Sequence, residues 1–318
     1  MFPTGIIDLH CDTLTRDMWA AQPPGCGPLD NPAHHIVLSK MPQNTRWVQC
    51  FAIFVPDNYR GQDAIDFFDR YRAVFDQQMA EHGNQIAPCR SFADMEQALD
   101  GGKFAAVLTV EGGAVLAGQP ERAQVLRDAG VRMLTLTWNG ENELGSGNVT
   151  DHGLSDFGRE AVRELERAGI LVDVSHLNDR GFDNLLAAAE KPFVASHSNA
   201  RAVCGHRRNL TDEQIAEMVR RDCLIGLNYA QNFLRTGDRP ATVDDLFRHV
   251  EHFLELGAAD CLALGSDADG TDVPPGLDCP EKFAGLYQYF LDRGLSSAQA
   301  ENILWRNAFR FMEKNLVK

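Results

Sequence analysis

Two residues with metal-binding side chains, His10 and Asp12, are the first unusual feature of the sequence. They end the short apolar run IIDLHCDTL, and Cys11 lies between them. Because side chains alternate along a β-strand, His10 and Asp12 can point to the same side while Cys11 points away. An imidazole beside a carboxylate can bind a divalent cation, although an isolated His-x-Asp pair often occurs by chance.

Three more residues of metal-binding type end other apolar segments. Glu111 ends FAAVLTVE, His176 ends ILVDVSH and His197 ends PFVASH. Glu111 has two oxygens and could bridge two metals, while the histidines would supply a second, nitrogen-rich pocket. Imidazole and carboxylate ligands without thiolate suit zinc best, with manganese, iron or cobalt as alternatives. Two metals roughly 3.5–4 Å apart would hold a bridging hydroxide, a nucleophile that is available at neutral pH.

Each of these residues also has an ordinary structural interpretation. A buried histidine is often satisfied by a backbone hydrogen bond, and Asp267 and Asp269 could form a turn around Gly270. The joint placement of five metal-binding side chains at strand ends of one polarity favours a shared site. Five other histidines lack this context and are assigned no role: His34, His35, His82, His249 and His252.

Eight apolar segments recur along the chain and are typical of strands that are buried on both faces. In order, they are GIIDLH, RWVQCFAIFV, FAAVLTVE, RMLTLTW, ILVDVSH, PFVASH, LIGLN and CLALGSD. Their alternation with helical segments predicts an α/β fold, the (β/α)8 TIM barrel, in which the C-terminal ends of all strands meet at one rim. A doubly wound open sheet is the alternative, but no GxGxxG fingerprint follows the first segment.

Helices are predicted in most of the gaps. Residues 156–169 have apolar positions at helical spacing and end on a glycine. The segment 210–221 begins with Thr211 and Gln214 at capping-box spacing, and residues 242–256 begin with a threonine that can cap a helix.

The remaining segments complete a single predicted domain that spans residues 1–318. The connection from about residue 20 to residue 46 is rich in proline and glycine, and we expect a loop there, with a short extra strand at HIVLSK. From about Pro280 the chain is expected to be helical and to close the outer layer of the barrel.

Composition excludes several classes of function. The net charge is -15 with a pI of about 5.0, and no segment is densely basic, so a nucleic acid is not an expected partner. No signal peptide is visible, and no apolar run approaches the roughly 18 residues of a membrane span. The eight cysteines are scattered without CxxC pairs. Such cysteines are typical of free thiols in a reducing compartment, so we expect a cytoplasmic protein.

With these residues assembled, the chain resembles the membrane (renal) dipeptidase family of zinc peptidases, including its soluble bacterial members. The matching pieces are, in order, DLHCDTL, VEGG, GLSDFGREAVRELERAGILVDVSH, SHSNARAVCGHRRNL and GSDADG. The resemblance implies a (β/α)8 barrel with two zinc ions that acts on dipeptides and related small amides. It also implies that His10 and Asp12 hold one zinc, that His176 and His197 hold the other, and that Glu111 bridges them.

The resemblance assigns further roles residue by residue. Arg208, the second arginine of HRRN, matches the family's binder of the substrate's terminal carboxylate, and a guanidinium fork suits that task. Asp267 matches the aspartate beside the substrate amino group and is a candidate proton carrier. Glu111 and Asp267 are therefore the candidate catalytic residues. Trp138 and Tyr229 join Arg208 and Asp267 as candidate substrate-binding residues.

One segment departs from the family pattern. The family reads LTLTH, and its histidine contacts the carbonyl oxygen of the scissile bond, whereas this chain reads LTLTWNGENELGSG with Trp138 in that place. An indole has one N–H donor and no basic nitrogen. Asn139, Asn142 or His152 in the following loop are candidate substitutes. Removal of one oxyanion donor without a substitute typically costs on the order of 10²–10³ in rate.

The expected function is that of a zinc-dependent dipeptidase, whose bridging hydroxide attacks the peptide carbonyl of a small substrate. An alternative keeps both metals but changes the bond to a non-peptide amide, an N-acyl amino acid or a lactone, because Trp138 alters the pocket. A further alternative is a non-catalytic barrel that binds a small ligand. The resemblance also makes a homodimer plausible.

Overall fold

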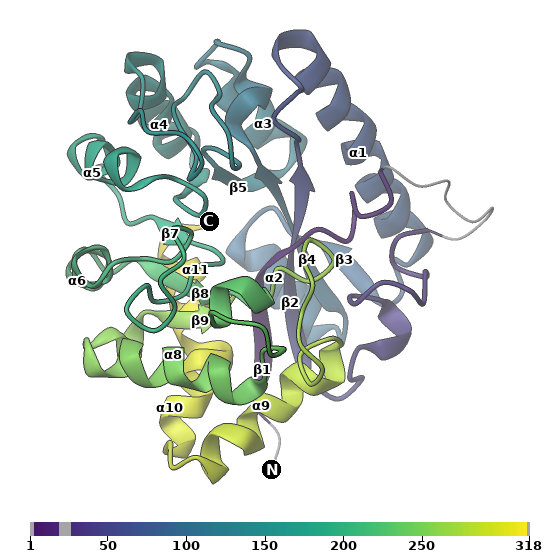
Figure 1. The fold of residues 1–318 in the computed structure, drawn as a ribbon. Helices are drawn as coiled ribbons and strands as arrows, with labels where there is room; N and C mark the ends of the chain where they lie inside the picture. Colours follow the sequence, from purple (N-terminus) through teal and green to yellow (C-terminus); the bar gives the residue numbers. More distant parts are fainter. Residues whose placement is uncertain (1–2, 19–26, 317–318) are drawn as a thin grey trace.

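The computed structural model describes residues 3–18 and 27–316 of the chain, and within them eight parallel strands close into a barrel surrounded by helices (Figure 1). All eight come from the predicted apolar segments. They are β1 (Gly5–Cys11), β2 (Arg46–Phe54), β4 (Phe104–Glu111), β5 (Val131–Thr135), β6 (Leu171–Asp173), β7 (Val194–Ala195), β8 (Leu224–Leu227) and β9 (Leu262–Leu264).

The order of the strands closes the sheet into a ring. The sheet runs β2-β1-β9-β8-β7-β6-β5-β4-β3, and an additional pairing of β2 with β4 joins its ends. This closure confirms the barrel and excludes the open doubly wound sheet. A short strand that the sequence did not predict, β3 (Ile86–Pro88), pairs with the start of β4 outside the ring.

The helices form the outer layer of the barrel, and some of them cover its lower end, where the strands begin. They are α1 (Gly61–Glu81), α2 (Phe92–Asp100), α3 (Arg122–Ala129), α4 (Asp156–Ala168), α5 (Asp179–Ala188), α6 (Asp212–Arg220), α7 (Gln231–Leu234), α8 (Val243–Glu255), α9 (Pro280–Asp292), α10 (Ser297–Glu301) and α11 (Asn307–Asn315).

The local helix signals are confirmed. Helix α4 ends at Gly169, which has a φ of 74°, a left-handed conformation that glycine adopts without strain. The capping box of Thr211 and Gln214 begins α6, and a second one begins α8. These signals succeeded because they depend only on residues that are close in sequence.

The extra strand expected at HIVLSK is wrong. This segment contains a single 3-10 turn, η1 (Leu38–Lys40), and no strand. Its backbone N–H groups at His35 and Ile36 donate instead to the carboxylate of Asp269, at 2.7 and 3.2 Å. Both edges of β1 are already paired in the ring, so this apolar stretch has no free strand edge beside β1. Residues 19–26 of the predicted loop lie outside the described part of the chain.

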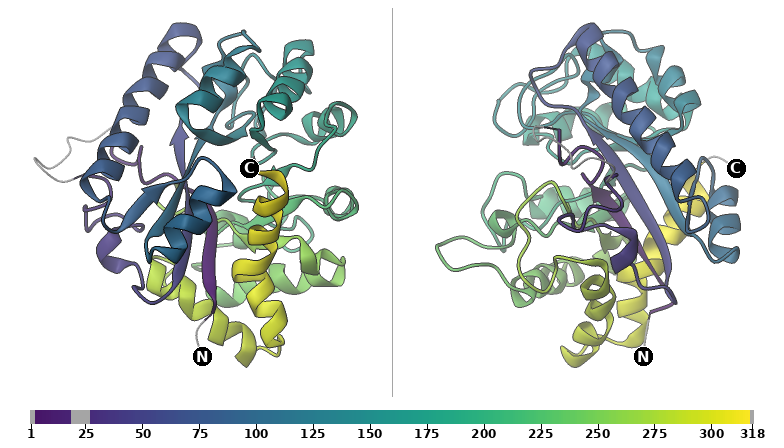
Figure 2. Two further views of the ribbon diagram at one scale, coloured as in Figure 1. Left: turned by 180° about the vertical axis from the view of Figure 1, so that it is seen from behind. Right: turned by 90° about the vertical axis from the view of Figure 1, so that its right-hand side faces the viewer.

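The C-terminal segment is helical, as predicted, but part of it closes the lower end of the barrel. Trp305, Phe311 and Met312 pack in one cluster with Ile7 and Val48, at the end of the barrel where the strands begin. In the side view, α11 lies on the opposite side of the sheet from the green and purple loops (Figure 2, right). This packing leaves the rim at the strand C-termini open for a site.

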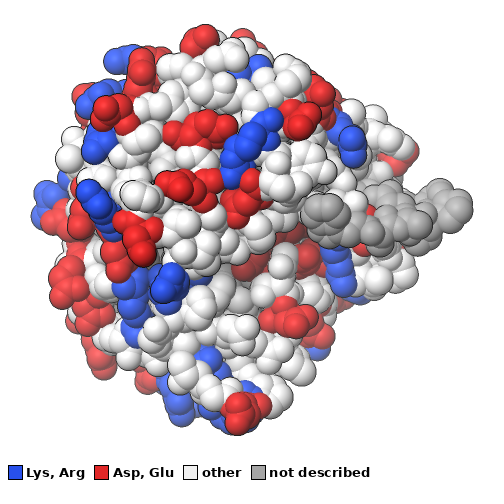
Figure 3. All heavy atoms as spheres, turned by 45° about the horizontal axis from the view of Figure 1, so that its top comes forward, with Lys and Arg blue, Asp and Glu red and all other residues white. Residues whose placement is uncertain are grey.

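Three expectations concern the described residues: membrane spans, the state of the cysteines and the distribution of surface charge. No helix among them is long and apolar enough to cross a membrane. All seven described cysteines are free thiols, and six of them are buried. On the described part of the face in Figure 3, acidic and basic side chains are interspersed and form no continuous basic patch.

Candidate metal centre

Strand β1 has one more residue than β2 over the same stretch, and this irregularity sets the direction of His10. Asp8 pairs with Gln49, but Cys11 pairs with Phe51, so three residues of β1 advance against two residues of β2. A β-bulge of this kind lets two consecutive residues face the same side of a sheet.

Strict alternation would place Asp8 and Asp12 on the same face of the sheet, and the bulge places them on different faces. Leu9 packs in the cluster at the lower end of the barrel, and Cys11 packs in the larger outer core. Asp8 is held by Ser266, whose backbone N–H and hydroxyl donate to its carboxylate at 2.7 and 2.6 Å. His10 and Asp12 face each other at the rim. The predicted alternation therefore holds from His10 onward.

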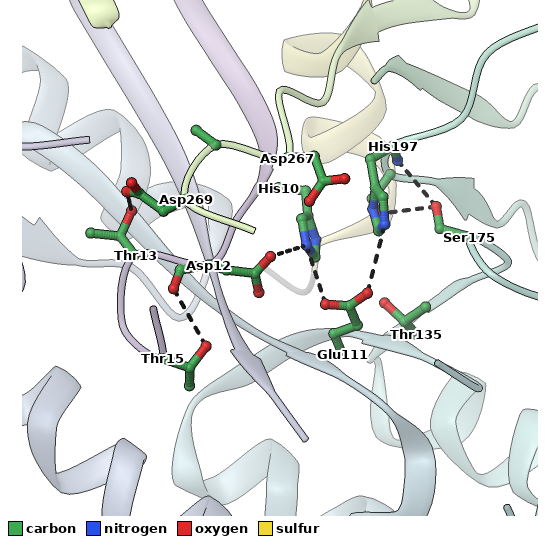
Figure 4. A network of polar contacts seen from close by, with 12 residues as sticks. His10, Asp12, Thr13, Thr15, Glu111, Thr135, Ser175, His197, Asp267 and Asp269 are labelled. Carbon is green, nitrogen blue, oxygen red and sulfur yellow. Dashed lines mark hydrogen bonds and ion pairs between the residues drawn. The ribbon is translucent and has the colours of Figure 1, made fainter. Parts of the chain in front are cut away.

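The five predicted metal-binding side chains meet at this rim, and Glu111 lies between His10 and His176. Figure 4 labels four of the five: His10, Asp12, Glu111 and His197. Oε2 of Glu111 is 3.5 Å from Nε2 of His10, which is 3.4 Å from Oδ2 of Asp12. Oε1 of Glu111 is 2.7 Å from Nε2 of His176 and 3.7 Å from Nε2 of His197. One oxygen of the carboxylate is thus nearest to His10, and the other is nearest to His176.

His197 is oriented by a buried hydrogen-bond chain. Its Nδ1 is 2.7 Å from Oγ of Ser196, and that hydroxyl donates to Oδ2 of Asp173 at 2.6 Å. Because the hydroxyl proton is engaged by Asp173, the imidazole N–H donates to Ser196, and the lone pair of Nε2 faces Glu111. Asp173 also accepts bonds from one other hydroxyl and two backbone N–H groups, so the chain is firmly fixed.

His176 is oriented by an amide. Its Nδ1 is 3.0 Å from Oδ1 of Asn139, and the same oxygen accepts a bond from Nδ2 of Asn148 at 2.7 Å. The backbone of His176 has a φ of 71°, in the left-handed region that residues with a Cβ rarely adopt. Strained backbone at the mouth of a cavity is a recurrent feature of functional sites.

Burial and neighbouring charges separate the protonation states of these groups. Burial lowers the pKa of His176 to about 4 and lowers the pKa of His197 well below its ordinary value. Burial alone would raise the pKa of Glu111, but His176 and His10 hold that pKa below its ordinary value. A neutral imidazole at His176 and at His197 and an ionised Glu111 are the forms that bind a metal. His10 differs, because burial would lower its pKa but the charges of Asp12 and Glu111 outweigh burial and raise that pKa well above the ordinary value.

The described residues fit a divalent cation. Nε2 of His10 and Oδ1 of Asp12 are buried and have no hydrogen-bond partner among the described residues. Burial, together with the charge of Glu111, raises the pKa of Asp12 to about 7. Buried polar atoms without partners are costly unless another group satisfies them, and a cation among these donors would do so. Two overlapping donor groups have atoms within 4.8 Å of one another: His10, Glu111 and His197, and His10, Asp12 and Asp267.

A cavity of about 360 Å³ opens beside these donors. Trp138 lines it and packs edge-to-face against Phe54, with ring centroids 4.8 Å apart. The lining combines acidic side chains with aromatic and other apolar ones. Its lining includes Asp12, Met18, Phe54, Glu111, Trp138, Asn139, His176, Phe233 and Asp267.

Asp267 lines this cavity, whereas Arg208 contacts His197 but is not among the residues that line the cavity. Arg208 is buried, its Nη2 donates to the carbonyl of His197 at 3.3 Å, and its guanidinium lies 5.3 Å from the ring centroid of Phe233. Its Nε has no partner among the described residues. Asp267 accepts a bond from Nδ2 of Asn228 at 2.9 Å, and burial raises its pKa to about 6. Arg208 thus offers a guanidinium with an unused N–H donor, and Asp267 offers a carboxyl that can hold a proton.

Tyr229 lies elsewhere. It is fully buried, packs edge-to-face against Phe283 with centroids 5.2 Å apart, and does not appear among the residues that line the cavity. The geometry therefore gives no support to its predicted role in substrate binding.

Sequence reasoning gave no role to two aromatic residues of the cavity. Phe54 is the last residue of β2 and pairs with Glu111, the last residue of β4, so strand order could have placed it at the rim. Phe233 lies in the short helix α7 after β8, where no local pattern marks it. Asp269 was noted only as a turn former, yet it anchors the long loop after β1.

The chain is similar to known proteins in sequence and in structure. A sequence model of the membrane dipeptidase family, peptidase family M19, matches residues 2–318. An uncharacterised protein from the pqqA 5′ region of Klebsiella pneumoniae is 30% identical over 264 residues, which are 79% of this chain and 97% of that protein. An uncharacterised dipeptidase of Schizosaccharomyces pombe is 32% identical over 213 residues, which are 65% of this chain and 52% of that protein.

Solved structures show the same barrel. A dipeptidase of metallopeptidase family M19 superimposes with a TM-score of 0.88 at 25% identity, covering 99% of both chains. A metallopeptidase from Rhodobacter sphaeroides, bound to a phosphinate mimic of the dipeptide L-Ala-D-Ala, has a TM-score of 0.89 at 24% identity, with 98% of this chain and 99% of that one covered.

The barrel and its cluster of imidazole and carboxylate donors define a metal-dependent hydrolase. The chain belongs to the membrane dipeptidase family, peptidase family M19, and is a peptide-bond hydrolase of the metallo-dipeptidase type. This assignment argues against the alternative of a non-catalytic barrel.

Proposed function

We propose that this protein hydrolyses dipeptides with two zinc ions held at the barrel rim. The observation that supports two ions rather than one is the position of Glu111, whose oxygens face His10 on one side and His176 on the other. His10 and Asp12 would hold one ion, and His176 and His197 the other. When bound, such ions polarise the scissile carbonyl and make water nucleophilic at neutral pH.

The chain itself would supply substrate binding through Arg208. A buried guanidinium can grip a terminal carboxylate with two parallel hydrogen bonds, and Nε of Arg208 is still without a partner among the described residues. The ring of Phe233 supports the guanidinium from one face. A substrate held there by its carboxylate would lie beside the donors of the rim.

Asp267 would move the proton. Burial raises the pKa of Asp267 to about 6, so near neutral pH its carboxyl can exchange a proton in both directions. It would take a proton from the attacking water and deliver it to the departing amine. The same carboxylate would also face the free amino group of a dipeptide.

The proposal is tested with purified protein. Metal content is measured after dialysis, and turnover is measured on a panel of dipeptides and on matched N-acyl amino acids. We expect about two equivalents of zinc, turnover of the dipeptides, and little turnover of substrates whose amino group is blocked. Equal or faster turnover of N-acyl amino acids would instead favour the non-peptide amide alternative. A cytoplasmic location and a homodimer stay predictions.

A further inference from the structure

The loop that follows β5 contains three polar residues that could donate to the substrate carbonyl: Asn139, Asn142 and His152. The structure distinguishes among them. Asn142 is used within the loop, because its Nδ2 donates to the carbonyl of Leu136 at 2.8 Å and its Oδ1 accepts from the backbone of Leu144 at 2.8 Å. His152 is exposed to solvent. Among the three, Asn139 lines the cavity.

The two ends of the Asn139 side chain have different surroundings. Oδ1 accepts two hydrogen bonds, from Nδ1 of His176 at 3.0 Å and from Nδ2 of Asn148 at 2.7 Å. Asn148 is itself buried, and its carbonyl accepts a bond from Nη1 of Arg207 at 2.7 Å. Nδ2 of Asn139, by contrast, makes no hydrogen bond within the described part of the chain.

Chemistry fixes the orientation of this amide. Nε2 of His176 lies 2.7 Å from Oε1 of Glu111 and 3.0 Å from Nε2 of His197; when this nitrogen binds a metal through its lone pair, the ring proton is on Nδ1. A proton on Nδ1 requires an acceptor, and of the two ends of the Asn139 amide only the oxygen can accept. Rotation of the amide by 180° would place its Nδ2 donor opposite the donors of His176 and Asn148. Oδ1 therefore faces His176, and Nδ2 is the end that remains for a ligand.

We propose that Asn139 has two linked roles, which rest on the proposed dipeptidase function. Its oxygen positions His176 as a metal ligand, and its Nδ2 donates to the carbonyl oxygen of the scissile bond as negative charge develops there. Asn139 thereby supplies an amide N–H donor one residue after Trp138, whose own side chain has a single indole N–H. A donor fixed by two outer hydrogen bonds needs no reorganisation during the reaction, which is the basis of oxyanion stabilisation.

Two substitutions at one position separate the roles. Asn139→Asp keeps an oxygen for His176 and Asn148 but removes the Nδ2 donor. We expect kcat to fall by about 10²-fold while metal affinity is retained. Asn139→Leu removes both functions at similar size. We expect the same fall in kcat and, in addition, metal affinity that is about 10- to 100-fold weaker. Metal affinity is measured on the metal-free protein by competition with a chromophoric chelator, so this readout does not depend on activity.

His152→Ala is the matched control in the same loop and should keep both wild-type kcat and wild-type metal affinity. Circular dichroism and thermal melting show whether each variant folds. If a variant at Asn139 unfolds, Asn148→Ala tests the same link from its outer end, because it releases the amide without touching the cavity. That variant should lower kcat below the wild-type value, by less than the roughly 10²-fold expected for full loss of the donor, and should leave metal affinity unchanged.

Two results would overturn the inference. Wild-type kcat in Asn139→Asp, or in Asn148→Ala when it takes the place of that variant, excludes the donor role, and wild-type metal affinity in Asn139→Leu excludes the positioning role. Either result would leave the dipeptidase proposal intact, provided that the wild-type protein hydrolyses dipeptides. If the wild-type protein does not hydrolyse them, the proposed function fails, while the chelator titration still tests the link to His176.

Discussion

Oε1 of Glu111 lies 2.7 Å from Nε2 of His176, although β4 and β6, which lead to these two residues, are not neighbours in the barrel. The other oxygen of Glu111 faces His10 at 3.5 Å. One carboxylate therefore contacts both His10 and His176 inside the rim. No local feature of the chain around either residue fixes this distance.

The first prediction follows from this position. Glu111→Gln replaces a shared anionic ligand by a neutral amide, so both metals should bind more weakly. We expect less than one equivalent of retained zinc and a fall in kcat/KM of at least about 10³-fold, with unchanged circular dichroism. Elemental analysis and dipeptide hydrolysis measure the two effects. Full zinc content in this variant would contradict a bridging role.

The second prediction concerns Arg208. Arg208→Lys keeps the charge but loses the planar fork, so binding of the substrate carboxylate should weaken by about 2 kcal/mol, or roughly 30-fold, seen mainly as a higher KM. Dipeptides with an amidated C-terminus serve as the control, because they present no carboxylate. The wild-type enzyme and the variant should turn over the amidated substrates equally slowly. An unchanged KM for free dipeptides would show that Arg208 does not hold the carboxylate.

The third prediction concerns Asp269, whose side chain is inaccessible to solvent. It accepts bonds from the hydroxyl of Thr13 at 2.6 Å, from Arg16 at 2.5 Å and from the backbone N–H groups of His35 and Ile36. An asparagine cannot satisfy all of these donors. Asp269→Asn should therefore lower the free energy of unfolding by on the order of 3 kcal/mol, measured by urea denaturation.

A positional control for Asp269 lies nearby. Asp272 is exposed to solvent, and Asp272→Asn should change stability by less than about 0.5 kcal/mol. Limited proteolysis should also cut residues 27–40 faster in Asp269→Asn than in the control. Equal stability of the two variants would show that the loop after β1 is held by other contacts.

The fourth prediction concerns pH. His249 is buried, accepts a bond from the backbone N–H of Ala200 at 3.1 Å and lies 3.0 Å from the carbonyl of Leu234. Burial lowers the pKa of His249 to about 4, whereas the unfolded chain has a pKa of about 6.5. Between these values the unfolded state binds more protons, so stability should fall as the pH drops from 6.5 to 4, by up to about 3 kcal/mol.

The measurement for His249 is urea denaturation of metal-free protein at several pH values, so that loss of metal does not contribute. His249→Gln should be less stable than the wild type at pH 7 but should lose less stability on acidification. His252→Gln, on the same helix, retains His249 and should keep the wild-type pH dependence. A steep loss of stability in His249→Gln would assign the acid sensitivity to other groups.

Strand β1 contains both a feature that the sequence predicts and one that it does not. The apolar run predicted the strand, and the alternation from His10 to Asp12 placed both side chains on one side. The bulge before His10 was not predictable, because it depends on the pairing of β1 with β2. Without the bulge, Asp8 and His10 would share a face, and the donor set would have a different composition.

The sequence by itself determined the eight strands, the capped helices and the chemical types of the donors, because apolar runs, capping boxes and ligand chemistry depend on neighbouring residues or on side-chain identity. Only the tertiary structure decided that HIVLSK is not a strand, that Tyr229 is buried against Phe283, and that Asn139 faces the cavity while Asn142 does not. These outcomes depend on which hydrogen-bonding partners and which surfaces remain free once the barrel has closed, and no local pattern records that.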